Sequence, residues 1–289
     1  MIKRRRAPAT HAARTAALFL GALTAAALLA SVLMPDAAAT LDLSYRRAAP
    51  SLSHWFGTDE LGRDVFVRVL NGARVSLAIG LLSALLSAAL GTAIGVTAGY
   101  ARRWIDDVLM RFTDAMLSVP RLPLLMIAAA ILQPGVPLLV LMVGAVGWME
   151  TARVVRAEVQ SIATRDFVTA ARGIGASPAR VVWRHVLPGV VPTVSVATTL
   201  AVGRGILLES ALSFFGVGVQ PPTASWGNML YQAQTTMMTE PWLALFPGAF
   251  IFLTVLACNS VSARRDAGPR PVLAHTGRRT QLERITPLS

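Results

Sequence analysis

Residues that could carry out chemistry are scarce in this sequence and stand far apart. The chain of 289 residues has one lysine, Lys3, and one cysteine, Cys258, and its four histidines are scattered. A zinc site needs several Cys or His ligands at close spacing, and a phosphate-binding loop needs a lysine behind a glycine-rich turn. We therefore expect no metal site in this chain and no site at which it would hydrolyse a nucleotide itself.

Outside an amphipathic segment at residues 108–115, the apolar stretches hold two basic residues, Arg121 and Arg204. A charged side chain inside a membrane costs about 2.5–3.5 kcal/mol on insertion scales. Glu209 follows Arg204 by five residues, which places it about 140° round a helix and makes it a poor partner within that helix. Arg204 therefore faces a path through the membrane, pairs with another subunit or extends towards the membrane surface. A membrane-embedded enzyme would need convergent acids, histidines or a nucleophile, and the stretches show only these arginines and carboxylates at their borders.

The composition indicates the class of protein that carries these residues. The apolar fraction is 54%, the charged fraction 15% and the mean hydropathy +0.56. A soluble domain is closer to about a quarter charged, and a disordered chain needs low hydrophobicity. A polytopic membrane protein is the class that fits these values.

Six apolar runs are long enough, alone or extended, to form membrane helices. They cover residues 16–34, 75–100, 108–132, 136–149, 190–208 and 242–258. We expect Pro120 and Pro123 to kink or restart the third helix. The fourth run is short, and we expect its helix to continue through Glu150 and Arg156.

A ladder of glycines marks the second run. Gly91, Gly95 and Gly99 recur every four residues and share one helix face. Small residues at this spacing allow another helix backbone to approach closely, although glycines are also common in membrane helices generally. We interpret the ladder as a packing face without being able to name its partner.

The basic residues predict the topology. The net charge is +12, and with the N-terminus in the cytoplasm the inside segments carry twenty basic residues and the outside segments five. This excess follows the positive-inside rule, which explains the basic character without nucleic-acid binding. A cleaved signal peptide is the competing interpretation of the N-terminus, because small residues follow at 37–39. We favour a retained helix, since the apolar run is longer than the core of most signal peptides.

The polar stretch of residues 166–188 predicts two short helices joined by a turn. Gly175 suits the left-handed position that ends the first helix. Ser177 suits the N-cap of the second helix, and Pro178 suits its first turn. Valines and a tryptophan give the second helix an apolar stripe. Because so small a helix pair buries little surface, it must dock on the membrane domain or on a partner protein.

This stretch resembles the signature loop of ATP-binding-cassette importer permeases. The loop of that family has a Glu-Ala-Ala segment, then a glycine and, further on, a Leu-Pro pair. Ala170, Ala171, Gly175, Leu187 and Pro188 match it. Thr169 stands where the family has its glutamate, which removes one charge from the loop.

Other segments make the chain similar to the second permease of the dipeptide, oligopeptide and nickel importer group. These segments are His54–Asp64, Ala152–Glu158, Leu212–Pro222 and Ser225–Gly227. The similarity covers roughly residues 50–260. The ending that is usual in the family survives only as Arg265-Asp266, and the rest of the tail departs from it.

The resemblance implies an all-α membrane protein with six transmembrane helices and the type I importer permease fold. It implies a homologous first permease, two ATP-binding subunits that hold ATP and magnesium, and an extracytoplasmic solute-binding protein as partners. In a bacterial cytoplasmic (inner) membrane, this chain would form half of the pathway for di- and oligopeptides. Nickel, glutathione or another small solute are alternative cargoes. A membrane scaffold or sensor that transports nothing is the alternative from another class, and it would not need the loop.

The resemblance divides the chain into five parts. Residues 1–15 are a basic cytoplasmic segment, 16–34 the first helix, 35–74 an extracytoplasmic loop, 75–260 the permease core with a cytoplasmic coupling loop at 153–188, and 261–289 a disordered, basic cytoplasmic tail.

The resemblance also implies two sets of site residues. Contact with an ATP-binding subunit is expected from the coupling loop, through Ala170, Ala171, Gly175, Ser177, Pro178, Arg180, Val182, Trp183, Arg184, Leu187 and Pro188. Contact with the transport pathway or the binding protein is expected from Arg204, Glu209, Asp59 and Trp226. Glu209 is expected close to the outer surface.

Overall fold

The computed structural model describes residues 8–33, 41–133 and 135–266. Its helices are α1 (Pro8–Leu33), η1 (Leu43–Tyr45), α2 (Val65–Tyr100), α3 (Arg103–Ser118), α4 (Arg121–Leu132), α5 (Val136–Ala163), α6 (Asp166–Gly173), α7 (Pro178–Val181), the π-helix η2 (Val182–Val186), α8 (Leu187–Phe214), α9 (Trp226–Ala233) and α10 (Trp242–Asp266). The basic residues before Pro8, the small residues at 37–39 and the tail from 267 onwards lie outside the described residues.

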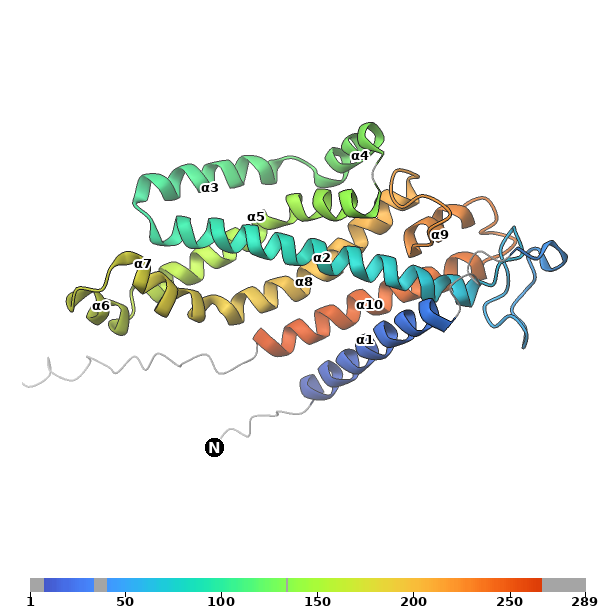
Figure 1. Cartoon of the computed structure of the whole chain (residues 1–289), viewed down its shortest axis with the longest axis horizontal. Coiled ribbons are helices and arrows are strands. Elements are labelled where there is room, and N and C mark those ends of the chain that lie inside the picture. The colour runs from blue at the N-terminus through green and yellow to red at the C-terminus, as the bar shows by residue number, and fades with distance from the viewer. Residues whose placement is uncertain (1–7, 34–40, 134, 267–289) are drawn as a thin grey trace, which may run out of the picture.

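The long helices form an elongated bundle. α2, α5 and α8 run through its middle, α3 lies along one flank, and α10 and α1 lie along the other (Figure 1). α6 and α7 lie at one end, here called the α6–α7 end, and α9 and residues 41–64 lie at the opposite end, here called the α9 end. The start of α1 and the end of α10 both point towards the α6–α7 end.

By length and composition, the described helices provide five candidate membrane spans, or six if the bent pair of α3 and α4 is one span. The pair bends by 78° at Pro120, and Pro123 lies in the first turn of α4, where the missing N–H removes no helical hydrogen bond. The expected break at these prolines is confirmed.

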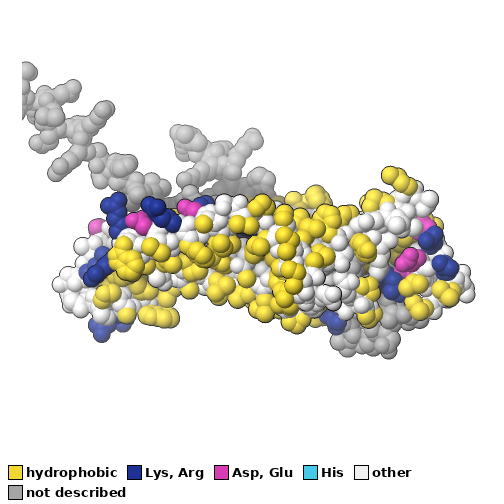
Figure 2. Space-filling model, turned by 90° about the horizontal axis from the view of Figure 1, so that it is seen from above, with side chains coloured by type: hydrophobic (Ala, Val, Ile, Leu, Met, Phe, Trp, Pro, Cys, Tyr) yellow, Lys and Arg dark blue, Asp and Glu magenta, His cyan; other side chains and the backbone are white. Residues whose placement is uncertain are grey.

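Several helices are longer than a bilayer is thick. α2 has 36 residues, which corresponds to about 54 Å, against roughly 30 Å for the hydrocarbon core. Figure 2 shows hydrophobic side chains over the middle of the molecule and most of the visible charges near its two ends. The helices therefore extend out of the membrane and support the structures at both ends.

The glycine ladder of α2 packs against α5. A Cβ atom added to Gly91, Gly95 or Gly99 would lie 2.6, 2.6 or 2.8 Å from its nearest atom, which in each case belongs to α5. These distances are far below normal carbon contacts of about 3.5–4.0 Å. The interpretation of the ladder as a packing face is confirmed, and its partner is α5.

The second helix begins earlier than expected. α2 starts at Val65 rather than at Val75, so the loop expected over residues 35–74 is shorter. Asp64 caps the helix by accepting a hydrogen bond from the Val67 N–H at 3.1 Å. Arg68 interrupts the apolar pattern in the sequence. In the structure its side chain is buried in an ion pair, and α2 continues through it.

Two other segments outside the apolar runs are also helical. The stretch between the apolar runs at 190–208 and 242–258 contains α9, whose first turn is closed by a capping box between Ser225 and Asn228. α10 continues to Asp266, so the tail expected from residue 261 begins as helix.

Candidate functional site

The turn between α6 and α7 is fixed by local interactions. Gly175 adopts φ +86°, and the N–H groups of Gly175 and Ala176 donate to the carbonyls of Arg172 (3.0 Å) and Ala171 (3.1 Å). This pair of bonds is a Schellman motif, which ends α6. The Ser177 hydroxyl then accepts from the Arg180 N–H at 3.4 Å, and Pro178 opens α7. The predicted glycine, cap and proline positions are all confirmed.

One face of this loop packs on the extended ends of α5 and α8. Val168 and Ala171 of α6, Val181 of α7 and Val186 of η2 are buried. They share a cluster with three α5 residues, Val155, Val159 and Ile162. The loop therefore rests on its own membrane helices and does not hang free.

The other face of the loop leaves apolar side chains uncovered. The exposed fractions are 74% for Trp183 and 88% for Ile174, and Phe167 is also exposed. Arg180 and Arg184 are exposed beside them, as are Ala170 and Pro188. The predicted apolar stripe is thus divided, because its valines face inwards and its tryptophan faces outwards.

The loop is joined to α8 without a break. α7, η2 and α8 follow one another directly and form one helical segment of 37 residues, Pro178–Phe214. Val182 and Leu187, at the ends of the π-helix, are partly buried against the same cluster. A force on α7 therefore acts on a continuous helix that crosses the membrane.

Three ion pairs connect α3 and α4 to α5. Asp106 of α3 pairs with Arg156, with Arg156 Nη2 2.6 Å from Asp106 Oδ2. Asp114 pairs with Arg153, whose Nε lies 3.1 Å from Oδ1. Arg121 of α4 extends Nη2 to within 2.8 Å of Glu150 Oε1. The α5 partners in these pairs follow one another at intervals of three residues. Neighbouring pairs therefore lie on the same side of α5.

Arg204 joins the last of these pairs. Its Nη1 forms an ion pair with Oε2 of Glu150, on α5. The expectation that Arg204 lacks a partner within this chain is therefore wrong, and one carboxylate is shared by Arg204 and Arg121. The side chains of Arg204 and Glu150 are 42% and 37% exposed, respectively.

The side chain of Glu209 lies in the protein interior. It is fully buried, and its carboxylate accepts hydrogen bonds from the hydroxyls of Ser76 (3.0 Å), Ser213 (2.8 Å) and Ser210 (3.5 Å). The Ser76 hydroxyl in turn accepts from the Trp226 N–H at 3.2 Å. Glu209 thus connects α2, α8 and the start of α9, and the expectation that it lines a contact surface is corrected.

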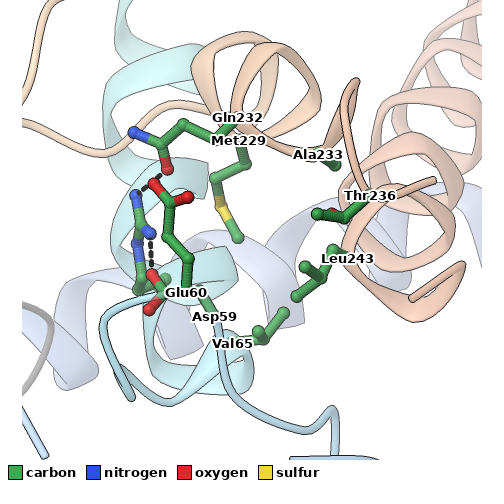
Figure 3. A pocket seen from close by; sticks show the side chains of 9 residues that line it. Asp59, Glu60, Val65, Met229, Gln232, Ala233, Thr236 and Leu243 are labelled. Atoms are coloured by element: carbon green, nitrogen blue, oxygen red, sulfur yellow. Dashed lines mark hydrogen bonds and ion pairs between the residues drawn. The ribbon is translucent and has the colours of Figure 1, made fainter. Parts of the chain in front are cut away.

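Asp59 is the centre of a second buried polar cluster, at the α9 end. It pairs with Arg63 (Nε to Oδ2, 2.7 Å) and with Arg68, and Arg68 Nη2 also donates to Gln232 of α9 at 2.9 Å. Figure 3 shows Asp59 and Gln232 on the same side of a small pocket, with Thr236 and Leu243 opposite. Burial raises the pKa of Asp59, but the Arg68 charge and the N–H groups of Arg63 and Leu61 outweigh it and leave the pKa below its usual value.

Trp226 is also buried, and its indole N–H donates to the Val69 carbonyl at 3.0 Å. With Asp59 7% exposed and Trp226 fully covered, neither side chain is presented to a binding protein. Both residues instead hold the segments of the α9 end together. Their expected role as direct contacts is corrected to a role in shaping that end.

A cavity larger than the pocket at Asp59 lies between α1, α2, α8 and α10. It has a volume of about 600 Å³. Apolar residues such as Leu20, Leu77, Leu81 and Val202 line much of it. An apolar lining suits a lipid chain or a neighbouring helix better than a polar solute, so we do not place solute binding there.

The sequence of this molecule matches a known family over most of the bundle. Residues 91–264 match the model of the binding-protein-dependent transport system inner membrane component. The chain belongs to this family. It is a permease subunit of an ATP-driven importer and a multi-pass membrane protein, and its family implies that it works with other transporter subunits.

Individual relatives of the permease match between 78% and 89% of its length. The glutathione transport system permease protein GsiD of Escherichia coli O157:H7 is 41% identical over 259 residues, which are 89% of this chain and 86% of the relative. The protein of the same name from Shigella sonnei gives the same values. A protein that bears the name of a peptide permease in Brucella suis biovar 1 is 40% identical over 230 residues, 78% of this chain and 76% of the relative.

Two residues of the permease escaped sequence analysis. Ile174 is the most exposed apolar side chain of the loop. Its position between Gly173 and Gly175 could have indicated this exposure, because a residue between two glycines at a helix end lies outside the packed helix. Glu150 was read as the point where a helix leaves the membrane. Its pairing with Arg204 joins residues 54 positions apart, and no local pattern indicates it.

Proposed function

We propose that this chain is the second permease of an importer for peptides or related small solutes. In this proposal it pairs with a homologous first permease, two ATP-binding subunits and an extracytoplasmic binding protein. Its own role is to form half of the pathway and to alternate between states open to each side. The ATP and magnesium would be bound by the ATP-binding subunits.

The observation that carries the proposal is the uncovered tip of the α6–α7 loop. Trp183 and Ile174 are apolar and highly exposed, and Trp183 lies between the exposed Arg180 and Arg184 in the sequence. Tryptophan and arginine are the residues most often found to dominate protein contacts. Because the loop also packs on α5 and continues into α8, closure of the ATP-binding subunits at this tip would move two membrane helices together.

The same proposal orients the molecule. The α6–α7 end would lie in the cytoplasm together with both chain termini, and the α9 end would face the binding protein. The excess of basic residues on the inside segments supports this orientation. The direction of α1 and α10 in Figure 1 agrees, since the start of α1 and the end of α10 both point towards the side of α6 and α7. The membrane would be the bacterial inner membrane.

The proposed cargo follows from the relatives. Their names specify glutathione in one case and peptides in the other. Glutathione is itself a small peptide-like molecule with free carboxylates, so one chemical class covers both names. We propose this class for the present chain, with the choice among its members made by the binding protein.

Crosslinking tests the coupling contact. Single cysteines replace the exposed Ala179 or Trp183 in a Cys258→Ala background, and the ATP-binding subunit carries a cysteine in its facing groove. We expect crosslinks whose yield changes with nucleotide. Val181→Cys is the matched control, because Val181 is fully buried and should stay unlinked. Absence of any crosslink at Ala179 and Trp183 in an assembled complex would contradict the proposed contact.

A further inference from the structure

Three charged side chains meet inside the bundle. Arg121 comes from α4, Glu150 from α5 and Arg204 from α8. Each carboxylate oxygen of Glu150 is engaged by a different arginine: Oε1 by Arg121 at 2.8 Å and Oε2 by Arg204. Two positive charges therefore share one negative charge, and the cluster carries a net charge of one positive unit.

The excess positive charge sets the cluster apart from the ion pairs between α3 and α5. The neighbouring pairs between α3 and α5, Asp106 with Arg156 and Asp114 with Arg153, match one acid to one base. Those pairs need no further ion. Arg204 is the additional charge, and it is supplied by a third helix.

The cluster lies deep along the helix axes. Glu150 is 14 residues from the start of α5, or about 21 Å, and Arg204 is 10 residues from the end of α8, or about 15 Å. Arg204 extends sideways to α5, so its side chain does not use its length to reach the membrane surface. Depth and direction together argue against a snorkelling arginine.

The cluster is nevertheless partly open. The side chains of Arg121, Glu150 and Arg204 are 23%, 37% and 42% exposed. Exposing a net charge to lipid at this depth costs about 2.5–3.5 kcal/mol or more. The exposed side is therefore expected to meet water, and a water-filled path through a permease is its pathway.

We propose that Arg204 and Arg121 form an anion-attracting site in the translocation pathway, which receives a carboxylate of the transported solute. Arginine has five N–H donors in a planar fork that fits a carboxylate, and the contact with Glu150 Oε2 uses only part of that fork. Glu150 positions both arginines and limits the affinity, so that the solute can leave again. This inference rests on the proposed transport function and adds the chemical group that the pathway recognises.

A thiol-labelling experiment tests the site directly in the assembled transporter. Leu207 lies three residues after Arg204, on the same helix face, and is 47% exposed. A single cysteine there, in a Cys258→Ala background, is treated with an anionic sulfonatoethyl or a cationic trimethylammonioethyl methanethiosulfonate. We expect the anionic reagent to react faster by about tenfold, as one nearby unit charge at intermediate dielectric allows.

Charge variants decide whether the arginines cause this preference. Arg204→Gln should abolish it, Arg204→Lys should keep it, and Glu150→Gln should increase it, because both arginines then lose their shared acid. Arg204→Gln leaves Glu150 paired with Arg121, so this variant should still fold. An unreactive cysteine would show that a partner subunit or lipid covers the cluster, and equal preferences in all variants would show that the arginines do not act; either result overturns the proposal.

Uptake assays separate this site from the proposed function. In proteoliposomes with all subunits and the binding protein, a panel of di- and tripeptides is tested for uptake and for stimulated ATP hydrolysis. We expect Arg204→Gln to lower the uptake of transported peptides by about tenfold while stimulated hydrolysis persists. Unchanged uptake overturns the carboxylate site alone. Failure of the wild-type complex to transport any peptide contradicts the proposed cargo, while the labelling result still reports on the site.

Discussion

Three buried or half-buried carboxylates are stabilised in different ways in this molecule. Asp59 is held by two arginines and two backbone N–H groups. Glu150 is shared between two arginines, and Glu209 is surrounded by serine hydroxyls. The arginines and N–H groups around Asp59 stabilise its ionised form. The serine hydroxyls around Glu209 can both donate and accept, so they can bond with either protonation state of its carboxyl group. Each residue therefore has a distinct sensitivity to substitution.

We predict that Asp59→Asn lowers the free energy of unfolding by about 3 kcal/mol, because it leaves Arg63 and Arg68 buried without their shared charge. Thermal unfolding of the detergent-purified protein measures the loss. Glu60→Gln is the matched control, since the neighbouring Glu60 is exposed and its change should be small. Equal melting temperatures for Asp59→Asn and Glu60→Gln would rule out the role assigned to Asp59.

The same residue predicts a dependence on pH. The folded-state pKa of Asp59 is depressed, so its contribution to stability is complete above the unfolded value of about 3.9 and is lost as the pH falls through the folded value. Melting temperatures recorded from pH 6 downwards should therefore fall in this acidic range for the wild type. Asp59→Asn should show a shallower decline, and parallel declines would contradict the assignment.

Gly175 allows a prediction that separates backbone strain from crowding. No atom lies within 4 Å of a Cβ added at Gly175, yet its φ of +86° disfavours any other residue by about 1–2 kcal/mol. We expect Gly175→Val to leave the protein inserted but to reduce uptake strongly by changing the angle between α6 and α7. Gly173→Ala is the control, because Gly173 is helical and equally uncrowded. Uptake that is equal in the two variants would show that the turn angle is unimportant.

At the scale of helices, the sequence was most informative where the interactions are local. The cap at Ser177, the turn at Gly175 and the break at Pro120 each depend on neighbours within a few residues, and each was predictable. The start of α2 was missed because Arg68 and Arg74 interrupt the apolar run, and the partner of Arg68, Asp59, is supplied by a preceding loop. The same limit applies to Arg204, whose acid lies on another helix.

The α2–α5 contact supplies a prediction at this scale. A methyl group at Gly95 would lie 2.6 Å from the Ala152 carbonyl oxygen and 2.8 Å from Val155 Cβ, neither of which can move without moving α5. We expect Gly95→Ala to destabilise the protein by about 1–3 kcal/mol. Gly21→Ala in α1, where no atom lies within 4 Å, is the control. A thermal-shift assay that ranks the two variants equally would contradict close packing along the ladder.

Across the whole molecule, the two ends differ in construction. The α6–α7 end is a short capped loop resting on long helices, whereas the α9 end is a larger assembly tied together by Asp59, Glu209 and Trp226. We expect the α6–α7 end inside the cell and the α9 end outside.

Labelling with a membrane-impermeant thiol reagent tests this orientation. Single cysteines replace Leu52, which is 98% exposed at the α9 end, or Ala179 at the α6–α7 end, both in a Cys258→Ala background. In spheroplasts we expect labelling at Leu52 alone, and after lysis at both positions. Labelling of Ala179 in intact spheroplasts would reverse the proposed topology.

The ion pairs along α5 also have a consequence for how the protein is made. Asp106, Asp114 and Arg121 emerge from the ribosome 50, 39 and 29 residues before their respective partners on α5. Until α5 is synthesised, the bent segment of α3 and α4 has unpaired charges and only a short apolar portion of its own. Its stable integration therefore has to wait for α5, so that the two segments leave the insertion machinery as a unit rather than one after the other.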